Sequence, residues 1–140
     1  TIDKSGQSDI ITFKVLNMII PLNTNPPVLE GLSQLFKVLT HPARIAILNI
    51  LRDGEHCVCH LEAYLGYRQS YISQQLAVLR EAGLIQDRRD GWNIYYRVGN
   101  AGIFDVLDAA LKTTGQTDTR LPNAKTSCTC PHCTTNTPSN

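Results

Sequence analysis

The chain has few aromatic residues, almost no net charge and no long hydrophobic run. Aromatic side chains make up 6% of its 140 residues, and 13 basic against 12 acidic residues leave a formal charge of +1. So small a net charge excludes a generally basic surface for nucleic acid, and any basic face must be local. The early apolar segment 10–20 is interrupted by Thr12, Lys14 and Asn17, and about 20 apolar residues are needed to span a bilayer. We therefore expect no membrane partner.

The sequence also lacks the features of a secreted disulfide scaffold. It has five cysteines, an odd number, and its first residues do not follow the pattern of a secretory leader. This combination predicts a cytoplasmic protein whose thiols stay reduced. The length leaves room for one small domain with a modest core, which argues against most multi-domain enzymes.

Composition divides the chain into three parts. Residues 1–27 have little periodicity, residues 28–112 show regular apolar spacing, and residues 113–140 are dominated by Thr, Ser, Asn and Pro. We predict an N-terminal arm, a core domain and a flexible cysteine-containing tail. Because the one methionine is Met18, residues 1–17 are interpreted as upstream or disordered sequence, with a native arm helix packed on the core as the alternative.

Apolar periodicity predicts four helices in the first part of the core. Two cover about 28–39 and 43–51, the second capped by Thr40. A short helix from about Cys57 to Leu65 follows, and Ser70 would cap a fourth that Gly83 ends.

The period then changes from helical to strand-like. Strands are expected over 84–89 and 92–98, joined at Asp90-Gly91, where both turn positions would have to tolerate a positive φ. A last helix over 102–112 has more apolar surface than so short a helix can bury alone, which indicates a second copy of the chain. The predicted fold class is mainly α with a β-hairpin wing (α+β), a winged helix-turn-helix homodimer.

The fourth helix has the features of a DNA-recognition helix. It follows a short Gly-containing turn at 65–68, and residues 67–97 hold five basic against three acidic residues, a local charge of +2. Neutral hydrogen-bonding side chains on its outer face suit base edges, and nearby arginines suit phosphates. The predicted DNA contacts are Arg68, Gln69, Ser70, Tyr71, Ser73, Gln74, Arg80, Arg88 and Arg89. Each is an ordinary surface residue when taken singly, but the combination predicts double-stranded DNA as a partner.

Three aromatic residues stand in or beside the second strand. Trp92, Tyr95 and Tyr96 could stack on bases, but strand residues of this kind more often pack a hairpin onto the body of a domain. We expect the packing role.

Several segments resemble, in the same order, the ArsR/SmtB family of metal-responsive transcriptional repressors. They are LFKVLTHPAR (35–44), EHCVCHL (55–61), SQQL (73–76), LREAGL (79–84) and YYR (95–97), and the resemblance covers residues 28–112. It implies a homodimer built on the first and last helices of the core. A two-fold symmetric dimer would read a palindromic operator with half-sites about 34–36 Å apart or a multiple of that distance.

The segment 55–59 resembles the thiolate motif of the family's cadmium/lead and arsenic sensors, which implies that Cys57 and Cys59 are metal ligands. The chain departs from each sensor type in one respect. Glu62 stands where the arsenic type has a third cysteine, the arm lacks the cysteines of the cadmium/lead type, and the last helix lacks the histidine of the zinc type. The ligand set near the third helix is therefore incomplete by itself.

Three further thiols lie in the tail, at Cys128, Cys130 and Cys133. They could bind one soft ion as an S3 site or contribute two sulfurs to an S4 site. The linker 113–127 spans about 20 Å on average and at most ~50 Å, so the tail could reach Cys57 and Cys59 of its own or the partner subunit. One shared site and two separate sites both remain open. The expected inducer is Cd(II) or Pb(II), then As(III), then Zn(II).

A helix N-terminus should lower the pKa of Cys57 and Cys59 and favour their thiolates. The alternatives are that these two cysteines are small buried hydrophobes, or that oxidation joins the thiols in a redox-responsive repressor. A remoter alternative is a thiol-disulfide oxidoreductase, because Cys130-Pro-His-Cys133 has the spacing of such enzymes. No βαβ pattern surrounds that motif, so we expect neither an enzyme nor a small-molecule substrate.

Overall fold

The computed structural model describes residues 26–116 and Cys128. Helix α2 (Pro26–Leu39) crosses the boundary between two compact units, Thr1–Leu35 and Phe36–Asn140. Most of the predicted arm and tail, including Cys130 and Cys133, lies outside the described residues. The division into arm, core domain and tail therefore stays a prediction.

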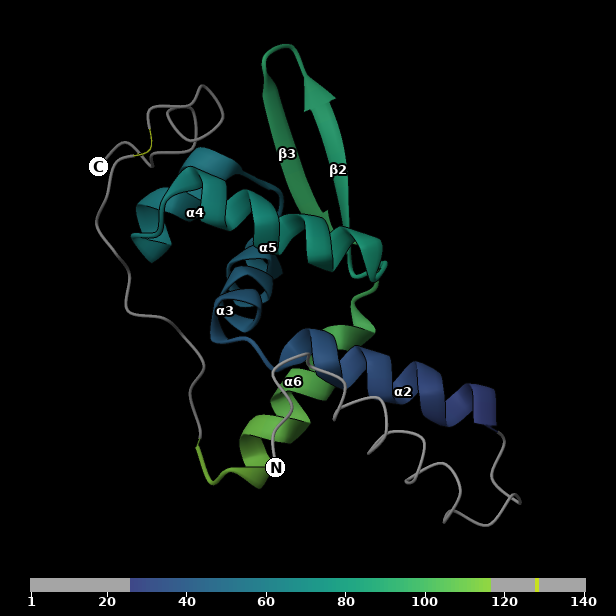
Figure 1. The fold of residues 1–140 in the computed structure, drawn as a ribbon. Coiled ribbons are helices and arrows are strands. Elements are labelled where there is room, and N and C mark those ends of the chain that lie inside the picture. Colours follow the sequence, from purple (N-terminus) through teal and green to yellow (C-terminus); the bar gives the residue numbers. More distant parts are fainter. Residues whose placement is uncertain (1–25, 117–127, 129–140) are drawn as a thin grey trace, which may run out of the picture. The chain divides into compact units, whose positions relative to one another are not determined.

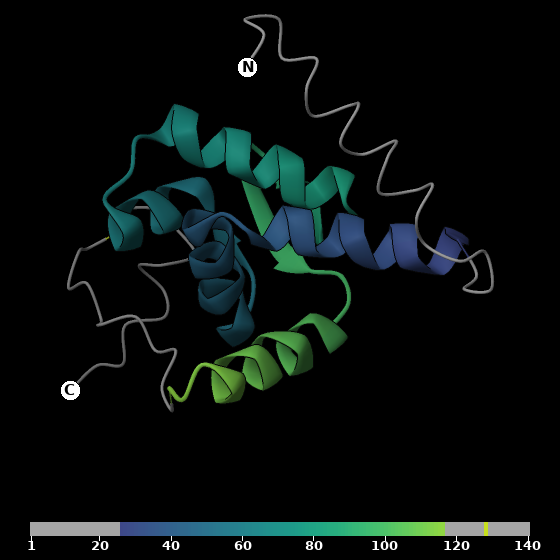
Figure 2. The same ribbon diagram turned by 60° about the horizontal axis from the view of Figure 1, so that its bottom comes forward.

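The second unit has the predicted order of helices followed by a hairpin and a last helix (Figure 1). Both ribbon views place α3 between the α4–α5 pair and α6 (Figure 2). The mainly α fold with a β-hairpin wing is confirmed. Its elements are α3 (Pro42–Ile50), the 3-10 turn η1 (Leu51–Asp53), β1 (His56–Cys57), α4 (Val58–Leu65), α5 (Gln69–Glu81), β2 (Ile85–Asp90), β3 (Asn93–Val98) and α6 (Gly102–Thr113).

A short third strand, β1, was not predicted. It pairs antiparallel with β3, with His56 opposite Tyr96 and Cys57 opposite Tyr95, so that the sheet order is β1-β3-β2. Cys57 therefore lies in a strand and directly precedes α4, rather than forming the first turn of a helix. Two residues are too few to show the alternation by which a strand is predicted.

The hairpin turn is one residue further along than predicted. Asp90 pairs with Asn93, so the two loop residues are Gly91 and Trp92. Gly91 has φ 59°, and no described residue other than glycine has a positive φ. A glycine alone at the first loop position is typical of a type II′ turn, in which the second position needs no positive φ.

Two predicted helix caps were wrong. The residue before α3 is His41, in an extended conformation, and the residue before α5 is Arg68. Thr40 instead donates its hydroxyl hydrogen bond back to the Lys37 carbonyl at 2.8 Å. Pro42 explains the first shift, because proline favours the first helical position and holds the preceding residue extended.

The core of the second unit is aliphatic. The side chains with almost no exposed surface are Ile47, Leu48, Leu61, Ile72, Leu76, Leu79 and Ile85. Three of them come from α5, so one face of that helix packs on the core and its other face is turned outward. No described helix has the length and hydrophobicity of a membrane span.

The packing role predicted for the wing aromatics is confirmed for two of the three. Tyr95 and Tyr96 are 4% and 8% exposed, whereas Trp92 is 102% exposed. The prediction for Trp92 was wrong because the residue belongs to the loop and not to the strand.

Candidate metal centre and nucleic-acid interface

The turn between α4 and α5 has the predicted glycine-dependent geometry. Gly66 ends α4 with φ 68°, in the left-handed region that glycine adopts most readily. Its amide donates to the Glu62 carbonyl at 2.9 Å. The chain then enters α5 at Gln69, so a short glycine-containing turn joins the two helices as in a helix-turn-helix.

The outer face of α5 carries four of the predicted base contacts in exposed positions: Gln69, Ser70, Ser73 and Gln74. Tyr71 is half-buried, and its hydroxyl lies 3.2 Å from His41 Nε2. The side chain of His41 thus positions the phenol of a candidate contact.

A part-buried hydrogen bond that was not predicted from the sequence connects α5 to α3. Arg44 Nε donates to Gln75 Oε1 at 3.0 Å, and Arg44 NH1 donates to the Val38 carbonyl at 2.8 Å. Gln75 is the one buried polar side chain among the described residues. A polar residue at this position, next to Leu76 on the buried face of α5, is the sequence feature that could have predicted the contact.

The four predicted arginine contacts differ in their surroundings. Among the described residues, Arg68 and Arg89 are exposed and have no carboxylate within ion-pair distance. Arg80 faces Asp87 at 3.6 Å, an ion pair that joins α5 to β2. Arg68 and Arg89 are therefore the better placed of the four to meet a phosphate.

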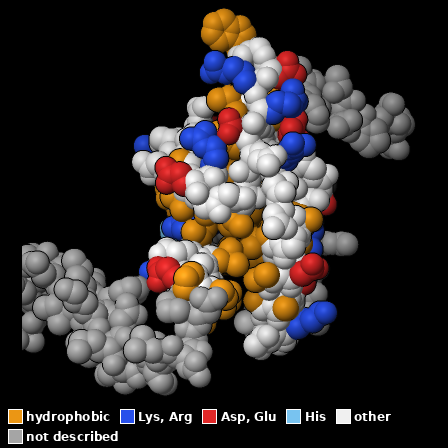
Figure 3. Space-filling model, turned by 90° about the vertical axis from the view of Figure 1, so that its right-hand side faces the viewer, with side chains coloured by type: hydrophobic (Ala, Val, Ile, Leu, Met, Phe, Trp, Pro, Cys, Tyr) orange, Lys and Arg blue, Asp and Glu red, His pale blue; other side chains and the backbone are white. Residues whose placement is uncertain are grey.

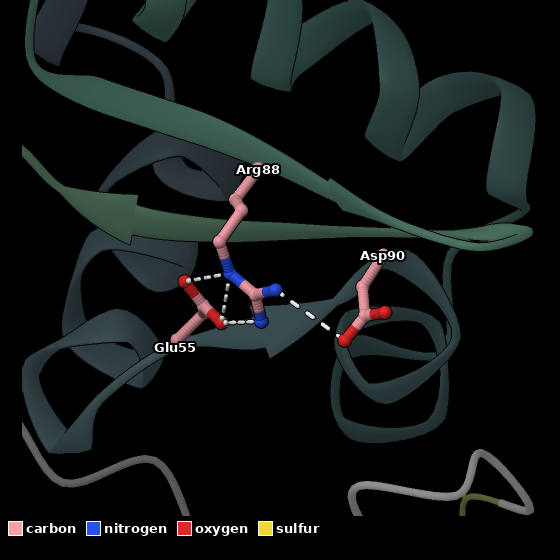
Figure 4. A network of polar contacts seen from close by, with 3 residues as sticks. All are labelled: Glu55, Arg88 and Asp90. Carbon is pink, nitrogen blue, oxygen red and sulfur yellow. Dashed lines mark hydrogen bonds and ion pairs between the residues drawn. The ribbon is translucent and has the colours of Figure 1, made fainter.

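Arg88 is held by two carboxylates, those of Glu55 and Asp90 (Figure 4). Its NH2 group donates to Glu55 Oε1 at 2.6 Å, and its NH1 group lies 3.4 Å from Asp90 Oδ2. The guanidinium also lies 5.1 Å from the centre of the Tyr95 ring. A phosphate would have to compete with Glu55 for this arginine.

Charges of both signs are mixed along the hairpin. The loop end of the hairpin lies at the top of Figure 1 and of Figure 3. There a hydrophobic side chain (orange) projects beyond basic (blue) and acidic (red) side chains (Figure 3). Any attraction for nucleic acid at the hairpin is therefore local.

Three of the five predicted thiols come together. Cys57 Sγ lies 2.6 Å from Cys59 Sγ, and Cys128 Sγ lies 3.1 Å from Cys59 Sγ. All three sulfurs fall within 4.8 Å of one another, and they are the one such group of three potential ligands among the described residues. The tail residue Cys128 thus lies at the start of α4. Cys57 is buried and packs with Tyr95 and Cys128.

The predicted lowering of the thiol pKa was wrong for Cys59. Burial raises the pKa of this thiol, and its hydrogen bonds with Cys57 and Cys128 raise it further. The residue as a whole is exposed, yet its sulfur lies between two others. Crowding of three thiols therefore outweighs the helix N-terminus, and the ion-free cluster favours the neutral form.

The donor set fits a soft ion. Thiolates are the ligands that Cd(II), Pb(II), As(III) and Zn(II) accept, and sulfurs about 2.3 Å from a tetrahedral zinc would be ~3.8 Å apart. An ion would therefore have to spread Cys57 and Cys59 by roughly an ångström. Two further donors, Cys130 and Cys133, lie outside the described residues.

Two histidines stand beside the cluster without joining it. His56 and His60 stack with ring centres 4.0 Å apart, and His60 stacks on Tyr64 at 4.4 Å. Their ring nitrogens are not among the grouped ligands.

A sequence model described as "Bacterial regulatory protein, arsR family" matches residues 41–87. The chain is 44% identical over 75 residues to the biofilm growth-associated repressor of Agrobacterium fabrum. The matched residues are 54% of this chain and 64% of that protein. The chain is also 46% identical over 66 residues to the arsenical resistance operon repressor of Escherichia coli, covering 46% of this chain and 56% of that protein. The chain thus spans less than two thirds of the length of these two relatives.

A longer match is to the HTH-type transcriptional regulator Rv0081 of Mycobacterium tuberculosis. The identity is 39% over 87 residues, which are 61% of this chain and 76% of that protein. Its crystal structure superimposes with a TM-score of 0.59 and 38% identity, covering 64% of this chain and 90% of that one. Sequence and fold therefore agree on one family.

Proposed function

The chain belongs to the arsR family of bacterial regulatory proteins, and from this premise we propose that it is a metal-responsive transcriptional repressor. It binds a palindromic operator as a homodimer when metal-free and releases the DNA when a thiophilic ion binds its cysteines. The observation that carries this proposal is the cluster of Cys57, Cys59 and Cys128, whose sulfurs lie within 4.8 Å although 71 positions separate the outermost two.

The outward face of α5 supports the DNA-reading part of the proposal. Ser73 and Gln74 are exposed there, and glutamine and serine can read base edges in the major groove. Arg68 and Arg89, exposed and without a described carboxylate partner, supply phosphate contacts. Gln69, Ser70, Tyr71, Arg80 and Arg88 complete the proposed interface.

The ion would be held by Cys57 and Cys59 together with thiols of the tail. Cys128 is the nearest of these, and Cys130 and Cys133 are the proposed remaining donors. Soft sulfur ligands favour Cd(II) or Pb(II), then As(III), then Zn(II). One named relative belongs to an arsenical resistance operon, which keeps the metalloid among the candidates.

The sheet offers a physical connection between the thiols and the hairpin. Cys57 pairs with Tyr95 across β1 and β3, and Tyr95 lies beneath Arg88 of β2. Glu55, two residues before Cys57, holds the same arginine. Spreading the sulfurs around an ion would therefore displace the residues that hold the hairpin in place. The hairpin follows α5 in the chain, so the displacement would reach the proposed DNA-binding surface.

The test is a titration of Cd(II), Pb(II), As(III) and Zn(II) into the protein bound to duplex DNA under reducing conditions. We expect at least one ion to release the DNA, as measured by fluorescence anisotropy of the labelled duplex. The Cys57→Ser/Cys59→Ser variant should bind DNA as before and not respond. Unchanged DNA affinity with all four ions would rule out the proposal.

A redox-responsive repressor is the second candidate, favoured by the short distances between the same sulfurs. Two thiols at 3.1 Å need move only about an ångström to form a disulfide bond. Cys59 and Cys128 would lose two electrons and two protons to an oxidant such as a peroxide, which is reduced to an alcohol or water. Release of DNA by mild oxidant without any ion, reversed by a thiol reductant, would favour this candidate over the first.

Dimer formation, location in the cytoplasm and the lack of catalysis belong to the same proposal. Related proteins are named as regulators, and the Cys130-Pro-His-Cys133 motif that could indicate an oxidoreductase lies outside the described residues. The proposed partners are a second copy of this chain and operator DNA.

A further inference from the structure

Gln75 is the one buried polar side chain among the described residues, and it lies in the middle of α5. It directly follows Gln74, which is exposed and which we propose as a base contact. The other buried residues of this helix, Ile72, Leu76 and Leu79, are aliphatic. A buried amide costs free energy unless it is hydrogen-bonded, so a glutamine on this face needs a specific partner.

Arg44 of α3 is that partner, and it binds a second helix at the same time. Its Nε donates to Gln75 Oε1 at 3.0 Å, and its NH1 donates to the Val38 carbonyl at 2.8 Å. Val38 belongs to the last turn of α2, where carbonyls lack partners within the helix. One guanidinium therefore connects α5 to the end of α2.

The chemistry of the arginine suits this double contact. Guanidinium donors lie in one plane and point in fixed directions, which a lysine ammonium does not provide. Arg44 has no carboxylate within ion-pair distance in the part of the chain that the structure describes. The two hydrogen bonds to neutral oxygens, and not an ion pair, therefore determine where this side chain lies.

The contact limits the rotation of α5 about its own axis. Ile72, Leu76 and Leu79 pack through apolar contacts, which have no preferred direction. A hydrogen bond has a preferred length and angle, so the Gln75 amide favours one orientation of the helix. The outward direction of the neighbouring Gln74 is set together with it.

The last turn of α2 belongs to a helix on which the proposed homodimer is built. Phe36, two residues before Val38, is 52% exposed and is thus available to a second copy. In a two-fold dimer, the orientation of α5 relative to this helix decides how far apart the two recognition helices lie. Arg44 therefore connects the helix that reads DNA to a helix that meets the partner.

We propose that Arg44 is a positioning residue for operator reading. By binding Gln75 and Val38 together, it fixes the separation of the two half-sites that the dimer accepts. It acts through Gln75 and makes no contact with the DNA itself. This inference rests on the proposed binding of a palindromic operator by a homodimer.

The test compares duplexes whose half-sites are separated by different spacers. The starting duplex is one that the wild-type protein selects from a random-sequence library, and its spacer is then lengthened or shortened by one base pair. Each base pair moves a half-site by about 3.4 Å and turns it by roughly 35°. Gln75→Met has a similar shape but no acceptor oxygen. We expect it to discriminate against the altered spacers about tenfold less than the wild type.

Further variants separate the hydrogen bond from packing. Gln75→Glu keeps the acceptor oxygen and should keep the wild-type spacer preference. Arg44→Lys keeps the charge but cannot bridge both acceptors, so it should resemble Gln75→Met. It also carries the test if circular dichroism shows that Gln75→Met is unfolded. Gln86→Met is the matched control, because it removes a similar hydrogen bond, from Arg97 at 3.1 Å on the hairpin, and should leave spacer preference unchanged.

Base preference gives a second readout that distinguishes positioning from base contact. Gln75→Met should keep the wild-type base preference inside each half-site, because the base-contacting side chains are unchanged. Ser73→Ala should do the opposite, with altered base preference and an unaltered spacer preference.

Two results would overturn the inference and leave the proposed function intact. The first is wild-type spacer discrimination in a folded Gln75→Met or Arg44→Lys variant. The second is an equal loss of affinity on every spacer, which would assign the contact to the stability of the fold alone. A wild-type protein that binds no duplex, or that selects duplexes with a single half-site, would overturn the proposed function as well.

Discussion

Ser73 and Arg89 offer different chemistry to a duplex, although both are exposed. A serine or glutamine on α5 bonds to particular base edges, whereas an arginine on the hairpin meets the uniform phosphate backbone. We expect Ser73→Ala or Gln74→Ala to change base preference by about 1–3 kcal/mol at one position. Arg89→Ala should weaken all sequences evenly and flatten the salt slope by about one. Binding to duplexes with single base changes, at several salt concentrations, measures both effects.

Arg97 provides the matched control for the arginine. It lies on β3 of the same hairpin, is exposed and donates to Gln86 Oε1 at 3.1 Å, and it is not a proposed contact. Arg97→Ala should leave the salt slope unchanged. An equal loss on every sequence from the Ser73, Gln74 and Arg89 variants would contradict this division of roles.

Single residues were predictable where a repeat placed them. The buried Ile72 and Leu76 follow the helical period, because one face of a helix repeats along many residues. Trp92 and Cys57 were misplaced, because a turn shifted by one residue and a two-residue strand leave no repeat to detect. The neutralisation of Arg88 by Glu55 depends on packing between segments 33 positions apart, which local pattern does not encode.

Glu55 connects the segment before β1 to β2 through Arg88. We expect Glu55→Gln to release the guanidinium for phosphate, so that DNA binds several-fold more tightly and the salt slope steepens by about one. The effect of a bound ion on DNA affinity should shrink, because the thiols would lose one connection to the hairpin. Anisotropy titrations with and without Cd(II) measure both changes.

Glu62→Gln is the control for this variant, since it removes the same charge from α4, close to the thiols. Among the described residues the Glu62 side chain has no ion-pair partner. If Glu55→Gln and Glu62→Gln changed DNA binding alike, the loss of one negative charge would explain the change, and the contact with Arg88 would not.

The tail should be necessary for the response to ions and dispensable for DNA binding. Truncation after Thr119 removes Cys128, which lies 3.1 Å from Cys59, together with the two later cysteines. We expect the ion response to be lost or greatly weakened while DNA affinity stays the same, as measured by the release titration. Truncation after Cys133 keeps all five thiols and should respond normally. A full response after the shorter truncation would remove the tail from the site.

Asp108 of α6 binds Arg52 of η1 at 2.8 Å. The hydrogen bond from Arg52 lowers the pKa of Asp108, so its stabilising contribution is present above the unfolded pKa of about 3.9 and is lost as the pH falls through the lower folded value. We expect Asp108→Asn to lower the thermal midpoint by a few degrees at pH 7 and to match the wild type in strong acid. Asp105→Asn, on the same helix, should have little effect at either pH. A difference that persisted in strong acid would contradict this account.

Elements were predicted better than the contacts between them. The helices and the hairpin follow from period and from glycine positions, such as Gly66 at the end of α4. Linker length showed that Cys128 could reach Cys59, but it allowed the partner subunit equally well. The packing of Cys128 against Cys57 and Tyr95 joins residues far apart in the chain, and local pattern does not encode such a contact.

The exposed large apolar side chains among the described residues lie mainly on α2, the first of the two helices expected to form the dimer. In α6, Ile103 and Leu107 face the core and are only 4% and 7% exposed, whereas Phe104, Val106 and Leu111 are half-buried. Four of the six exposed large hydrophobics belong to α2, at Val28, Leu29, Leu32 and Phe36. This spacing lies on one side of a helix and is where we expect a second copy to contribute most.

Coupling between ion and DNA must be reciprocal in the complete dimer. If an ion weakens operator binding by a given factor, the operator must weaken ion binding by the same factor, typically 5–150-fold or ~1–3 kcal/mol. We expect calorimetric titration of Cd(II) to show this loss of affinity when the selected duplex is present, and Cys57→Ser/Cys59→Ser to show no such difference. Equal ion affinity with and without DNA would contradict the proposed coupling between the two sites, because reversible binding requires the same factor in both directions. A redox-responsive repressor would show no such coupling, since it would release DNA on oxidation of its thiols and not on binding Cd(II).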